Sequence, residues 1–199
     1  MRGRTRSARP RGELRRRAIL EATLRVVGRD GAGALTHRAV AREAGVPLAA
    51  TTYYFASKDD LVREAFAFAM AEDVAALQSE SLLPACGELT VGALAQRLTA
   101  LMASRIGDDR ATLLVQYTLE LEAARRSELT GLSRAWTAAY VGAVAPALAA
   151  LGSADPKLDA WIVVTALEGM ELESLASGEV DAATALLPAV ERLLTSLVG

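Results

Sequence analysis

The sequence predicts an all-α protein, and both its composition and its hydrophobic spacing point to this fold class. Hydrophobic residues make up 52% of the chain, and Ala and Leu, which are strong helix formers, supply much of that share. Aromatic residues make up only 5%. Apolar residues recur at helical spacing through most of the chain, without the strand–helix alternation of an α/β protein. At 199 residues, the chain can form one or two domains with a hydrophobic core.

Residues 1–11 are expected to form a basic, flexible arm, or a tail that serves only solubility. This segment has no apolar periodicity and carries five arginines among Gly, Ser, Thr and Pro: Arg2, Arg4, Arg6, Arg9 and Arg11. The first helix should then span residues 12–28, because Leu14, Ile19 and Leu24 recur at helical spacing.

About eight further helices are expected, so that the fold has about nine. Thr36 is the expected N-cap of the second helix, and Ser57, with Asp60 three residues later, is the expected N-cap of a long fourth helix. Glycines and Asp or Ser pairs separate the later segments. The expected ranges are 36–45, 48–55, 58–81, 89–106, 108–126, 129–151, 156–177 and 181–198.

These segments divide into a head over residues 12–58, which follows the arm at residues 1–11, and a helical body over residues 59–199. Residues 1–60 hold 13 Lys and Arg against 6 Asp and Glu, a formal charge of +7. Residues 61–199 hold 9 against 18, a formal charge of −9. A basic head on an acidic body suggests that only the head meets a polyanion.

The remaining composition favours a cytoplasmic protein. The longest apolar stretches are interrupted before the roughly 18–20 residues that a membrane span needs. The basic N-terminal segment is not followed by the apolar core of a signal peptide. Cys86 is the single cysteine, so the chain has no internal disulfide and no Cys-based metal site. We expect no membrane partner, no cofactor and no metal.

The segment from Leu35 to Pro47 has the form of a helix-turn-helix. Small residues on the inner face of its first helix would let a second helix pack closely across it. Gly45 allows the tight reversal, and Val46 fills the angle between the helices. The second helix could then project its N-terminal side chains into the major groove of DNA. A lone pattern of this kind gives false positives, but here it lies in a basic head near the N-terminus.

Around this motif, the chain resembles the TetR family of bacterial regulators. The resemblance covers the head strongly, whereas the body is similar only in its helical layout. It rests on Leu35-Thr36, Ala39-Val40-Ala41 and Ala44-Gly45-Val46, and most specifically on Tyr54-Phe55 followed by Ser57-Lys58-Asp59-Asp60-Leu61. It implies a three-helix helix-turn-helix DNA-binding domain and a C-terminal helical domain for ligand binding and dimerisation.

The resemblance also suggests which side chains contact DNA. Thr36 and Lys58 should lie near phosphates. Thr52, Tyr53 and Tyr54 fall where the family uses side chains to touch the DNA backbone and support the recognition helix, although Tyr54 could instead be a packing residue. The base-reading residues should lie among His37, Arg38, Leu48, Ala49 and Thr51.

The expected recognition helix departs from the family pattern. Leu48 stands where Lys or Arg is frequent, and Thr52 where Tyr is frequent. Leu48 and Ala49 can contact thymine methyl groups but cannot hydrogen-bond a base, so polar readout would fall to Thr51 or Arg38. His37 could be a solvated helix residue instead. The arginines of the arm could reach an adjacent minor groove or only add salt-sensitive affinity.

One helix-turn-helix makes few contacts, so we expect a homodimer that reads two half-sites of a double-stranded operator. The last two expected helices carry apolar stripes that could form a four-helix interface, as the resemblance implies. The alternative is that these stripes close the core of a single subunit. The candidate interface residues are Leu158, Trp161, Ile162, Thr165, Gly169, Leu172, Leu186, Leu187, Val190 and Leu194.

An unknown small-molecule effector is expected to bind the body. Its candidate residues are polar or bulky side chains on apolar faces: Met102, Leu113, Gln116, Tyr117, Glu120, Trp136, Tyr140 and Glu168. A buried Glu120 would need a partner such as Arg105, Arg134 or a cationic ligand. Each of the two glutamates could also be a structural ion-pair member or exposed, and Trp136 and Tyr140 could be core residues.

Together these features predict a ligand-responsive regulator, in particular a repressor that a small molecule releases from a palindromic operator. An enzyme is not expected, because one His and one Cys leave no conventional triad and no phosphate-binding loop is visible. Two alternatives stay open: a helical adaptor that binds another protein, and an architectural DNA-binding protein without sequence preference.

Overall fold

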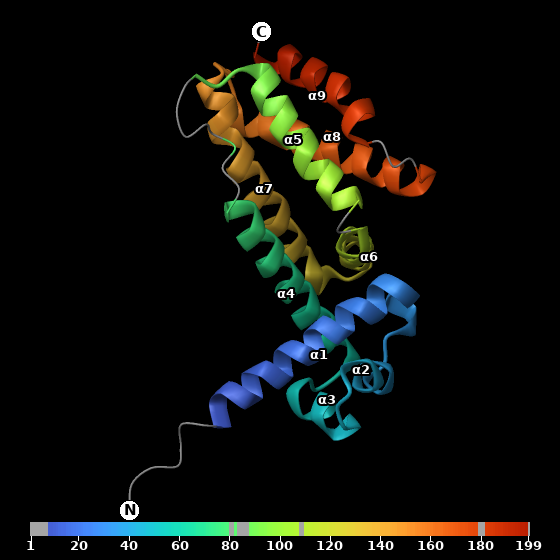
Figure 1. The fold of residues 1–199 in the computed structure, drawn as a ribbon. Helices are drawn as coiled ribbons and strands as arrows, with labels where there is room; N and C mark the ends of the chain where they lie inside the picture. The colour runs from blue at the N-terminus through green and yellow to red at the C-terminus, as the bar shows by residue number, and fades with distance from the viewer. Residues whose placement is uncertain (1–7, 80–81, 83–87, 108–109, 179–181, 199) are drawn as a thin grey trace, which may run out of the picture. The chain divides into compact units, whose positions relative to one another are not determined.

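A computed structural model describes residues 8–79, 82, 88–107, 110–178 and 182–198. Within these ranges every regular element is helical, which confirms the predicted all-α fold (Figure 1). The α-helices are α1 (Ala8–Asp30), α2 (His37–Ala44), α3 (Leu48–Tyr54), α4 (Lys58–Ser79), α5 (Val91–Gly107), α6 (Arg110–Arg125), α7 (Thr130–Ala150), α8 (Pro156–Ser177) and α9 (Ala182–Val198). None of these helices is both long and apolar enough to span a lipid bilayer.

The largest difference from the expected helix limits is at the start of α1. This helix begins at Ala8, so residues 8–11, which were expected in the flexible arm, are helical. The rest of the expected arm lies outside the described residues. Alternating small and basic residues with few β-branched side chains are compatible with a helix even though they carry no apolar stripe.

Contacts group the chain into two compact units. Unit one comprises Met1–Ala71 and Leu114–Leu132, and unit two comprises Glu72–Leu113 and Ser133–Gly199. Helices α4, α6 and α7 therefore contribute residues to both units. The predicted division after residue 58 concerns function and stays a prediction.

Unit one is held together by α1, which packs against α2, while α2 packs against α3. Buried side chains from residues 19–66 and from the segment at 114–132 form its core: Ile19, Leu20, Val26, Leu35, Val40, Phe55, Leu61, Phe66, Leu119 and Leu129. Because α2 and α3 both rest on this core, the opposite face of α3 is left uncovered within the unit.

Unit two is centred on α5, which packs along α9, while α8 contacts both helices. Its buried side chains include Leu94, Leu98, Leu148 and Val163. From α9, the core takes Leu186, Val190 and Leu194, at 8%, 0% and 0% exposure. The expectation that these three residues form a dimer interface is therefore wrong, because they already fill the core of their own subunit.

Candidate nucleic-acid interface and buried polar cluster

The helix-turn-helix begins where the sequence predicts. Thr36 has extended backbone angles, and its hydroxyl oxygen accepts a hydrogen bond from the amide of Ala39 at 3.0 Å, so it is the N-cap of α2. Its side chain lies on the surface at the positive end of the α2 dipole. This position suits a residue that approaches a phosphate.

The turn between α2 and α3 depends on Gly45. This glycine has φ 64° and ψ 31°, which is the left-handed region, and it ends α2. The amide of Val46 then donates to the carbonyl of Ala41 at 3.0 Å, which closes the turn. A second turn bond, from Ala50 to Pro47 at 2.8 Å, starts α3. The backbone thus reverses within three residues and presents the first turn of α3 outward.

The outward face of α3 carries no charged side chain. Leu48 is 44% exposed and Tyr53 is 81% exposed. Ala49 and Thr52 are exposed between them. The Thr52 hydroxyl lies 3.4 Å and 3.3 Å from the carbonyl oxygens of Leu48 and Ala49, so it is engaged as a donor inside its own helix. Such a hydroxyl keeps lone pairs that can accept a hydrogen bond from a base amino group.

Thr51 does not belong to that face. Its side chain is completely buried, and its hydroxyl donates to the carbonyl of Leu48 at 2.8 Å. The prediction that Thr51 supplies polar base readout is therefore wrong. One residue along a helix turns the side chain by about 100°, and here that rotation separates the buried Thr51 from the exposed Thr52.

The two polar candidates at the start of α2 differ. Arg38 is exposed and makes no ion pair within the described residues, so its guanidinium is available to DNA. His37 is half-buried, and its Nδ1 is buried without a hydrogen-bond partner in the part of the chain that the structure describes. Arg38 therefore fits a DNA contact better than His37.

The end of α3 is anchored by aromatic packing. Phe55 is buried, and the guanidinium of Arg16 lies 5.5 Å from the centre of its ring. Tyr54 is half-buried and meets Tyr53 edge to face, with ring centres 5.0 Å apart. Its hydroxyl lies against α1 near Gly12, where an added Cβ would be 3.5 Å away. Tyr54 thus supports α3 from the inside, whereas Tyr53 points to solvent.

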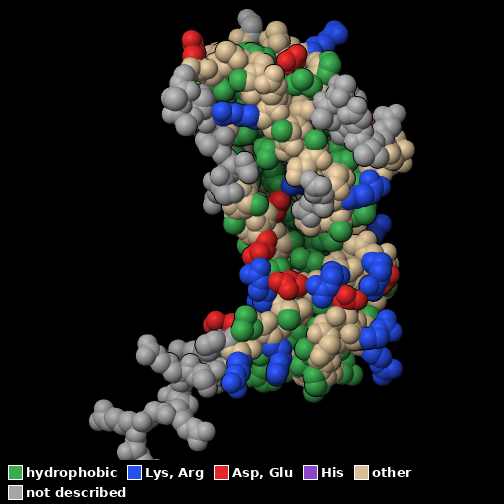
Figure 2. Space-filling model, in the orientation of Figure 1, with side chains coloured by type: hydrophobic (Ala, Val, Ile, Leu, Met, Phe, Trp, Pro, Cys, Tyr) green, Lys and Arg blue, Asp and Glu red, His purple; other side chains and the backbone are tan. Residues whose placement is uncertain are grey.

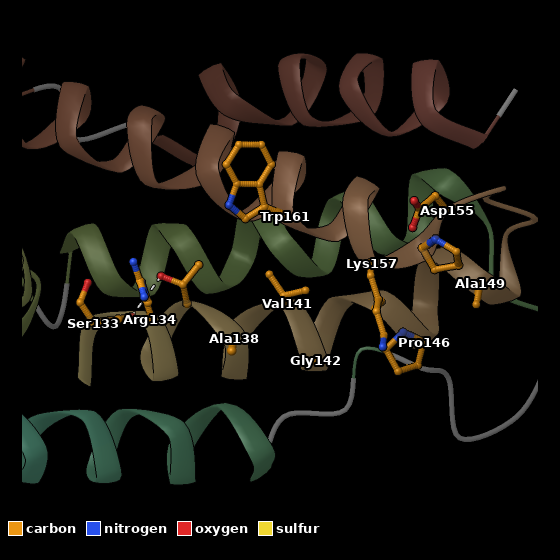
Figure 3. A pocket seen from close by; sticks show the side chains of 13 residues that line it. Ser133, Arg134, Ala138, Val141, Gly142, Pro146, Ala149, Asp155, Lys157 and Trp161 are labelled. Atoms are coloured by element: carbon orange, nitrogen blue, oxygen red, sulfur yellow. Dashed lines mark hydrogen bonds between the residues drawn. The ribbon is translucent and has the colours of Figure 1, made fainter. Parts of the chain in front are cut away.

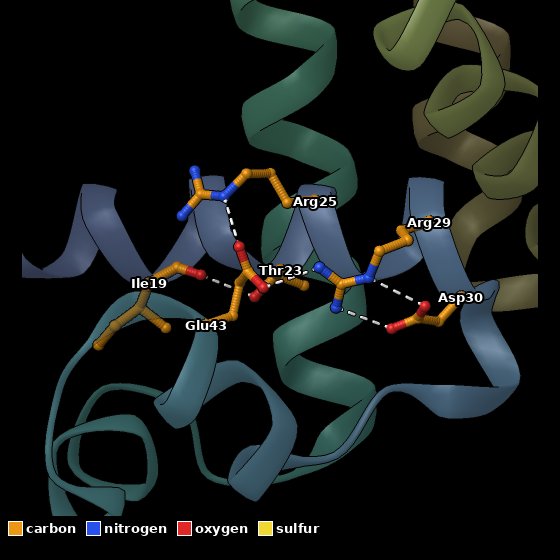
Figure 4. Close-up of polar contacts among 6 residues, drawn as sticks. All are labelled: Ile19, Thr23, Arg25, Arg29, Asp30 and Glu43. Atoms are coloured by element: carbon orange, nitrogen blue, oxygen red, sulfur yellow. Dashed lines mark hydrogen bonds and ion pairs between the residues drawn. The ribbon is translucent and has the colours of Figure 1, made fainter.

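A surface ion-pair cluster joins α1 to α2. Glu43 accepts hydrogen bonds from Arg25 at 2.9 Å and from Arg29 at 3.0 Å, and Arg29 also pairs with Asp30 at 2.8 Å (Figure 4). The hydrogen bonds from Arg25 and Arg29 lower the pKa of Glu43. On the face of unit one in view, basic and acidic side chains stand next to one another in the same way (Figure 2). Part of the head's positive charge is therefore already neutralised.

The start of α4 is capped by two side-chain hydrogen bonds, and Ser57 has the predicted N-cap role. The Ser57 hydroxyl accepts from the amide of Asp60 at 3.0 Å, and the Asp60 carboxylate accepts from the amide of Ala56 at 3.1 Å. Hydrogen bonds from Arg63 and from Ala56 lower the pKa of Asp60. Lys58, half-buried in the first turn, makes no ion pair among the described residues, so its ammonium group is available to a phosphate.

Unit two contains a buried polar cluster, which we call the Asp73 cluster, built from α4, α5, α7 and α8. Arg105 donates to Asp73 at 2.9 Å and to Glu171 at 3.0 Å. Trp136 donates its indole N–H to Asp73 at 2.7 Å. Tyr140 accepts from Arg105 at 2.7 Å and donates its own proton to Asp73. Two carboxylates against one guanidinium leave the cluster with a formal charge of −1.

Burial makes these interactions strong. The side chains of Arg105, Asp73 and Glu171 are 22%, 12% and 7% exposed. Burial alone would lower the pKa of Arg105, but the attraction of the Glu171 and Asp73 carboxylates outweighs it, so the net shift is upward. Burial and the adjacent Asp73 carboxylate raise the pKa of Tyr140, despite the opposing charge of Arg105. Tyr140 therefore keeps its proton and its role as a donor.

Two family models match the chain, one on each side of residue 71. Residues 19–65 match bacterial regulatory proteins of the tetR family. Residues 89–196, more than half of the chain, match the tetracyclin repressor-like C-terminal domain. The chain belongs to the tetR family. This confirms the predicted family.

The curated relatives are transcriptional regulators. The nicotine-responsive transcriptional repressor HdnoR of Paenarthrobacter nicotinovorans is 30% identical over 120 residues, which are 60% of this chain and 60% of HdnoR. The regulator BetI of Agrobacterium fabrum is 45% identical over 51 residues, or 26% of this chain and 25% of BetI. The chain thus aligns with no more than 60% of the length of these two relatives.

Solved structures match over a longer span. The multidrug binding protein EbrR complexed with ethidium is 31% identical with a TM-score of 0.71, and the match covers 92% of this chain and 97% of EbrR. A TetR-family member from Streptomyces coelicolor A3 is 32% identical with a TM-score of 0.70, and the match covers 93% of this chain and 98% of that protein. Other EbrR structures contain imidazole, proflavin or malachite green.

The predicted effector residues of this tetR-family chain fall into both units. In unit one, the amide nitrogen of Gln116 donates to Glu120 at 3.0 Å, and Tyr117 is half-buried beside them on α6. In unit two, Met102, Leu113 and Trp136 are buried, and Tyr140 and Glu168 are half-buried. Of this set, the Asp73 cluster brings together Trp136 and Tyr140. The predicted effector set as a whole stays a prediction.

Sequence reasoning missed Asp73 and Glu171 and named Arg105 only as a partner for Glu120. A signal for Asp73 exists in the sequence, because it continues the stripe of Val62, Phe66 and Ala69, all buried on α4. The helical spacing of the buried residues places this carboxylate on the core side of α4, where it requires a buried partner.

The predicted dimer residues on α8 are mostly exposed to solvent, whereas three of the four on α9 are buried. Leu158, Trp161 and Leu172 are 52%, 51% and 51% exposed, and Thr165 and Gly169 are exposed between them. Ile162 is half-buried, as is Leu187 on α9. The α8 stripe is therefore uncovered in a single subunit.

Proposed function

We propose that the chain is a ligand-responsive transcriptional repressor that binds a palindromic operator as a dimer and is released by a small molecule. The observation that carries this proposal is the outward face of α3, which a capped α2 and the Gly45 turn present without obstruction from unit one. The relative HdnoR is named a nicotine-responsive repressor, which supports both repression and ligand response. Such a protein works in the cytoplasm, where the chromosome lies.

The proposed readout is mainly apolar. Leu48 and Ala49 contact thymine methyl groups in the major groove, and Thr52 accepts from a base amino group. Thr36, Lys58 and the exposed Tyr53 contact phosphates and fix the register of α3 on the duplex. Arg38, exposed in the first turn of α2, supplies a cationic side chain.

Selection of genomic DNA fragments by the purified protein, at physiological salt and with competitor DNA, tests the proposal. The wild type should enrich one palindrome upstream of few genes. Ala49→Glu places a carboxylate in the proposed major-groove contact and should lose the enrichment through repulsion from phosphates. Ala100→Glu is the matched control, because Ala100 is exposed on α5 in unit two, and it should enrich the same palindrome.

Two outcomes would overturn the proposal. Uniform enrichment of unrelated fragments, equally by the wild type and Ala49→Glu, would indicate an architectural DNA-binding protein. Absence of DNA binding at any salt concentration would favour a helical adaptor whose basic head meets an acidic protein.

We further propose that the effector is an aromatic cation. The Asp73 cluster places two carboxylates beside an indole and a phenol, and these are groups that attract an aromatic cation. Ethidium, proflavin and malachite green, which occupy EbrR structures, are aromatic cations. The half-buried ring of Tyr140 already has the Arg105 guanidinium 5.7 Å from its centre, so it accepts a cation at this distance.

The proposed release mechanism uses α4 as the connecting element. This helix begins at Lys58, directly after α3, and carries Asp73 near its other end. A cation that binds the Asp73 carboxylate in one conformation better than in another shifts the population toward that conformation. The operator affinity then falls by the same factor by which operator DNA weakens ligand binding.

Titration with ethidium, without DNA, tests the effector class. Asp73→Asn keeps the shape of the side chain but removes the charge, so we expect affinity to fall about tenfold, as for loss of a charge-assisted contact. Glu88→Gln removes an exposed carboxylate in the same unit and should change little. Equal ethidium affinity in the wild type and in a folded Asp73→Asn variant would contradict the proposed role of this cluster.

A further inference from the structure

The guanidinium of Arg105 has the contacts that a small bound cation would make in the Asp73 cluster. Its Nη1 lies 2.9 Å from Oδ1 of Asp73 and 2.7 Å from the hydroxyl oxygen of Tyr140. Its central carbon lies 5.7 Å from the centre of the Tyr140 ring, within the range of a cation–π contact. A carboxylate oxygen, a hydroxyl oxygen and an aromatic ring therefore surround one planar cation that carries N–H groups.

The Asp73 carboxylate has two further donors besides Arg105. Its other oxygen, Oδ2, accepts a hydrogen bond from the indole N–H of Trp136 at 2.7 Å and another from the hydroxyl of Tyr140. Burial raises the pKa of Tyr140, so this hydroxyl keeps the proton that it donates. These two neutral donors hold the carboxylate in place if Arg105 moves away. Oδ1 then needs a new donor, because a buried carboxylate oxygen without a hydrogen bond is costly.

Arg105 also has a second carboxylate partner. Its Nε donates to Glu171 at 3.0 Å, and this is a different atom from the one that contacts Asp73. The side chain can therefore give up Asp73 and keep Glu171, and one added cation would then leave each carboxylate with a cationic partner. The contact given up joins α4 to α5, whereas the contact kept joins α5 to α8.

The contacts of Nη1 indicate the chemistry of a cation that replaces it. An NH₂ group with a delocalised positive charge can direct one hydrogen to Asp73 and the other to Tyr140. Amidinium and guanidinium ions carry such groups on a planar cation. A quaternary ammonium ion has the charge but no N–H, so it would leave Oδ1 of Asp73 without a hydrogen bond.

We propose that Arg105 competes with the effector's cation for Asp73, and that this site selects an aromatic amidinium or guanidinium over a quaternary ammonium ion. This inference rests on the proposed effector site at the Asp73 cluster and specifies the class of ligand that it takes. The effector binds when its cation replaces the guanidinium on Asp73 while Arg105 keeps Glu171. Arg105 thus determines how tightly the site binds, and Asp73 and Tyr140 determine which cations it accepts.

Three compounds of similar size test the chemical class with the full-length wild type. Benzamidine is a planar cation with N–H groups, phenyltrimethylammonium is a cation without N–H groups, and benzamide has N–H groups without the charge. In calorimetric titrations at pH 7, benzamidine should bind at least about tenfold more tightly than either of the other two. Equal affinities for benzamidine and phenyltrimethylammonium would overturn the proposed selectivity.

Removal of the competing side chain tests the role of Arg105. Arg105→Ala should raise the affinity for benzamidine by about tenfold or more, because no guanidinium has to leave Asp73 first. Arg105→Gln, which keeps an N–H donor without the charge and disturbs the packing less, should change the affinity in the same direction. Arg134→Ala, exposed on α7 in the same unit, is the matched control and should bind as the wild type does. A lower affinity in the Arg105 variants would show that Arg105 assists binding and would overturn the proposed competition.

The open groove between α7 and α8 is a second place where an aromatic cation could stack in unit two. It has a volume of about 1050 Å³, and the half-exposed indole of Trp161 lies on its wall (Figure 3). Its described lining residues, among them Arg134 and Lys157, are all outside the Asp73 cluster. Trp161→Ala should therefore leave the affinity for benzamidine unchanged. Loss of binding in Trp161→Ala but not in Asp73→Asn would assign benzamidine to the groove and overturn the inference.

Comparison with the ethidium titration separates the two possible failures. If Asp73→Asn weakens ethidium binding but benzamidine binds no better than phenyltrimethylammonium, the proposed effector site stands and only its selectivity for N–H-bearing cations is refuted. If a folded Asp73→Asn variant binds both ethidium and benzamidine as the wild type does, the effector site itself is refuted, and the role of Arg105 with it.

Discussion

The two units use arginine–carboxylate contacts in opposite ways. In unit one, Arg25 and Arg29 meet Glu43 on the surface, where their side chains are 53%, 55% and 23% exposed. In unit two, Arg105 meets Asp73 and Glu171, and these three side chains are 22%, 12% and 7% exposed. Water and salt screen the first set, whereas the second set has exchanged water for its protein partners.

The two sets of contacts therefore have different consequences. The surface contacts orient neighbouring helices, whereas the buried contacts favour one conformation of the unit over another. The Glu43 contacts hold α1 against α2 and leave α3 outward, but solvent can replace each of them at little cost. If a charged side chain of the Asp73 cluster loses its partner, a buried charge is left unpaired. Binding of a ligand to this cluster therefore requires a change in structure. In the function that we propose, DNA recognition uses the surface of unit one, and the ligand switch uses the interior of unit two.

The largest expected effect is on the buried cluster. Arg105→Met keeps much of the side-chain length but leaves two carboxylates without their cation, so the free energy of unfolding should fall by about 3–5 kcal/mol. Urea unfolding measures it. Arg134→Met, on the exposed surface of α7, is the control and should change little. Equal stabilities of the two variants would show that the cluster is not a buried charge network.

The two apolar stripes of unit two should also differ in their effects. Leu194→Ala removes a completely buried side chain on α9 and should lower the free energy of unfolding by about 2–5 kcal/mol. Leu172→Ala, at a half-exposed position on α8, should affect self-association more than subunit stability. Sedimentation and urea unfolding of both variants separate these effects, and a reversed result would exchange the roles of α8 and α9.

The turn of the helix-turn-helix should be sensitive to one methyl group. Gly45→Ala forces a residue with a side chain into the left-handed region and should lower the free energy of unfolding by about 1–2 kcal/mol. No atom lies within 4 Å of the added Cβ, so backbone strain alone causes this loss. Gly33→Ala, where φ is not positive and space is open, is the control. A clearly larger loss from Gly33→Ala would contradict this assignment.

The smallest effect should come from the exposed cap of α4, through its pH dependence. The folded pKa of Asp60 is lowered, so its contribution to stability is present above the unfolded pKa of about 3.9 and is lost as pH falls through the folded value. Asp60→Asn should therefore be less stable than the wild type at pH 7, and the difference should shrink toward pH 3. Thermal unfolding at both pH values measures it. A difference that grows on acidification would have the wrong sign.

Much of unit one could be predicted from local chemistry. Thr36 and Ser57 accept hydrogen bonds from amides three residues later, as N-caps do, and Gly45 has the left-handed conformation that ends a helix. Thr51 could not be assigned in the same way. Helix α3 has only seven residues, too few for a repeat of apolar residues to show which side is buried. The burial of Thr51 follows instead from the packing of α3 on the core.

The body was predictable in its helices but not in its contacts. Both α8 and α9 carry apolar stripes, and a stripe alone does not show whether a subunit's own core or a second copy covers it. The packing of α9 on α5 settles this for Leu186, Val190 and Leu194. Asp73 and Glu171 meet Arg105 from helices distant in sequence, and such long-range contacts leave only a weak local signal.

The specificity ratio of the purified wild-type protein tests the central claim most directly. Fluorescence anisotropy at physiological salt would compare the palindrome enriched from genomic fragments with a scrambled duplex of equal length and composition. The account predicts that the palindrome binds at least about 10³-fold more tightly, as expected for specific over non-specific sites. Equal affinity for the two duplexes would show that the outward face of α3 reads no sequence, and would contradict the account.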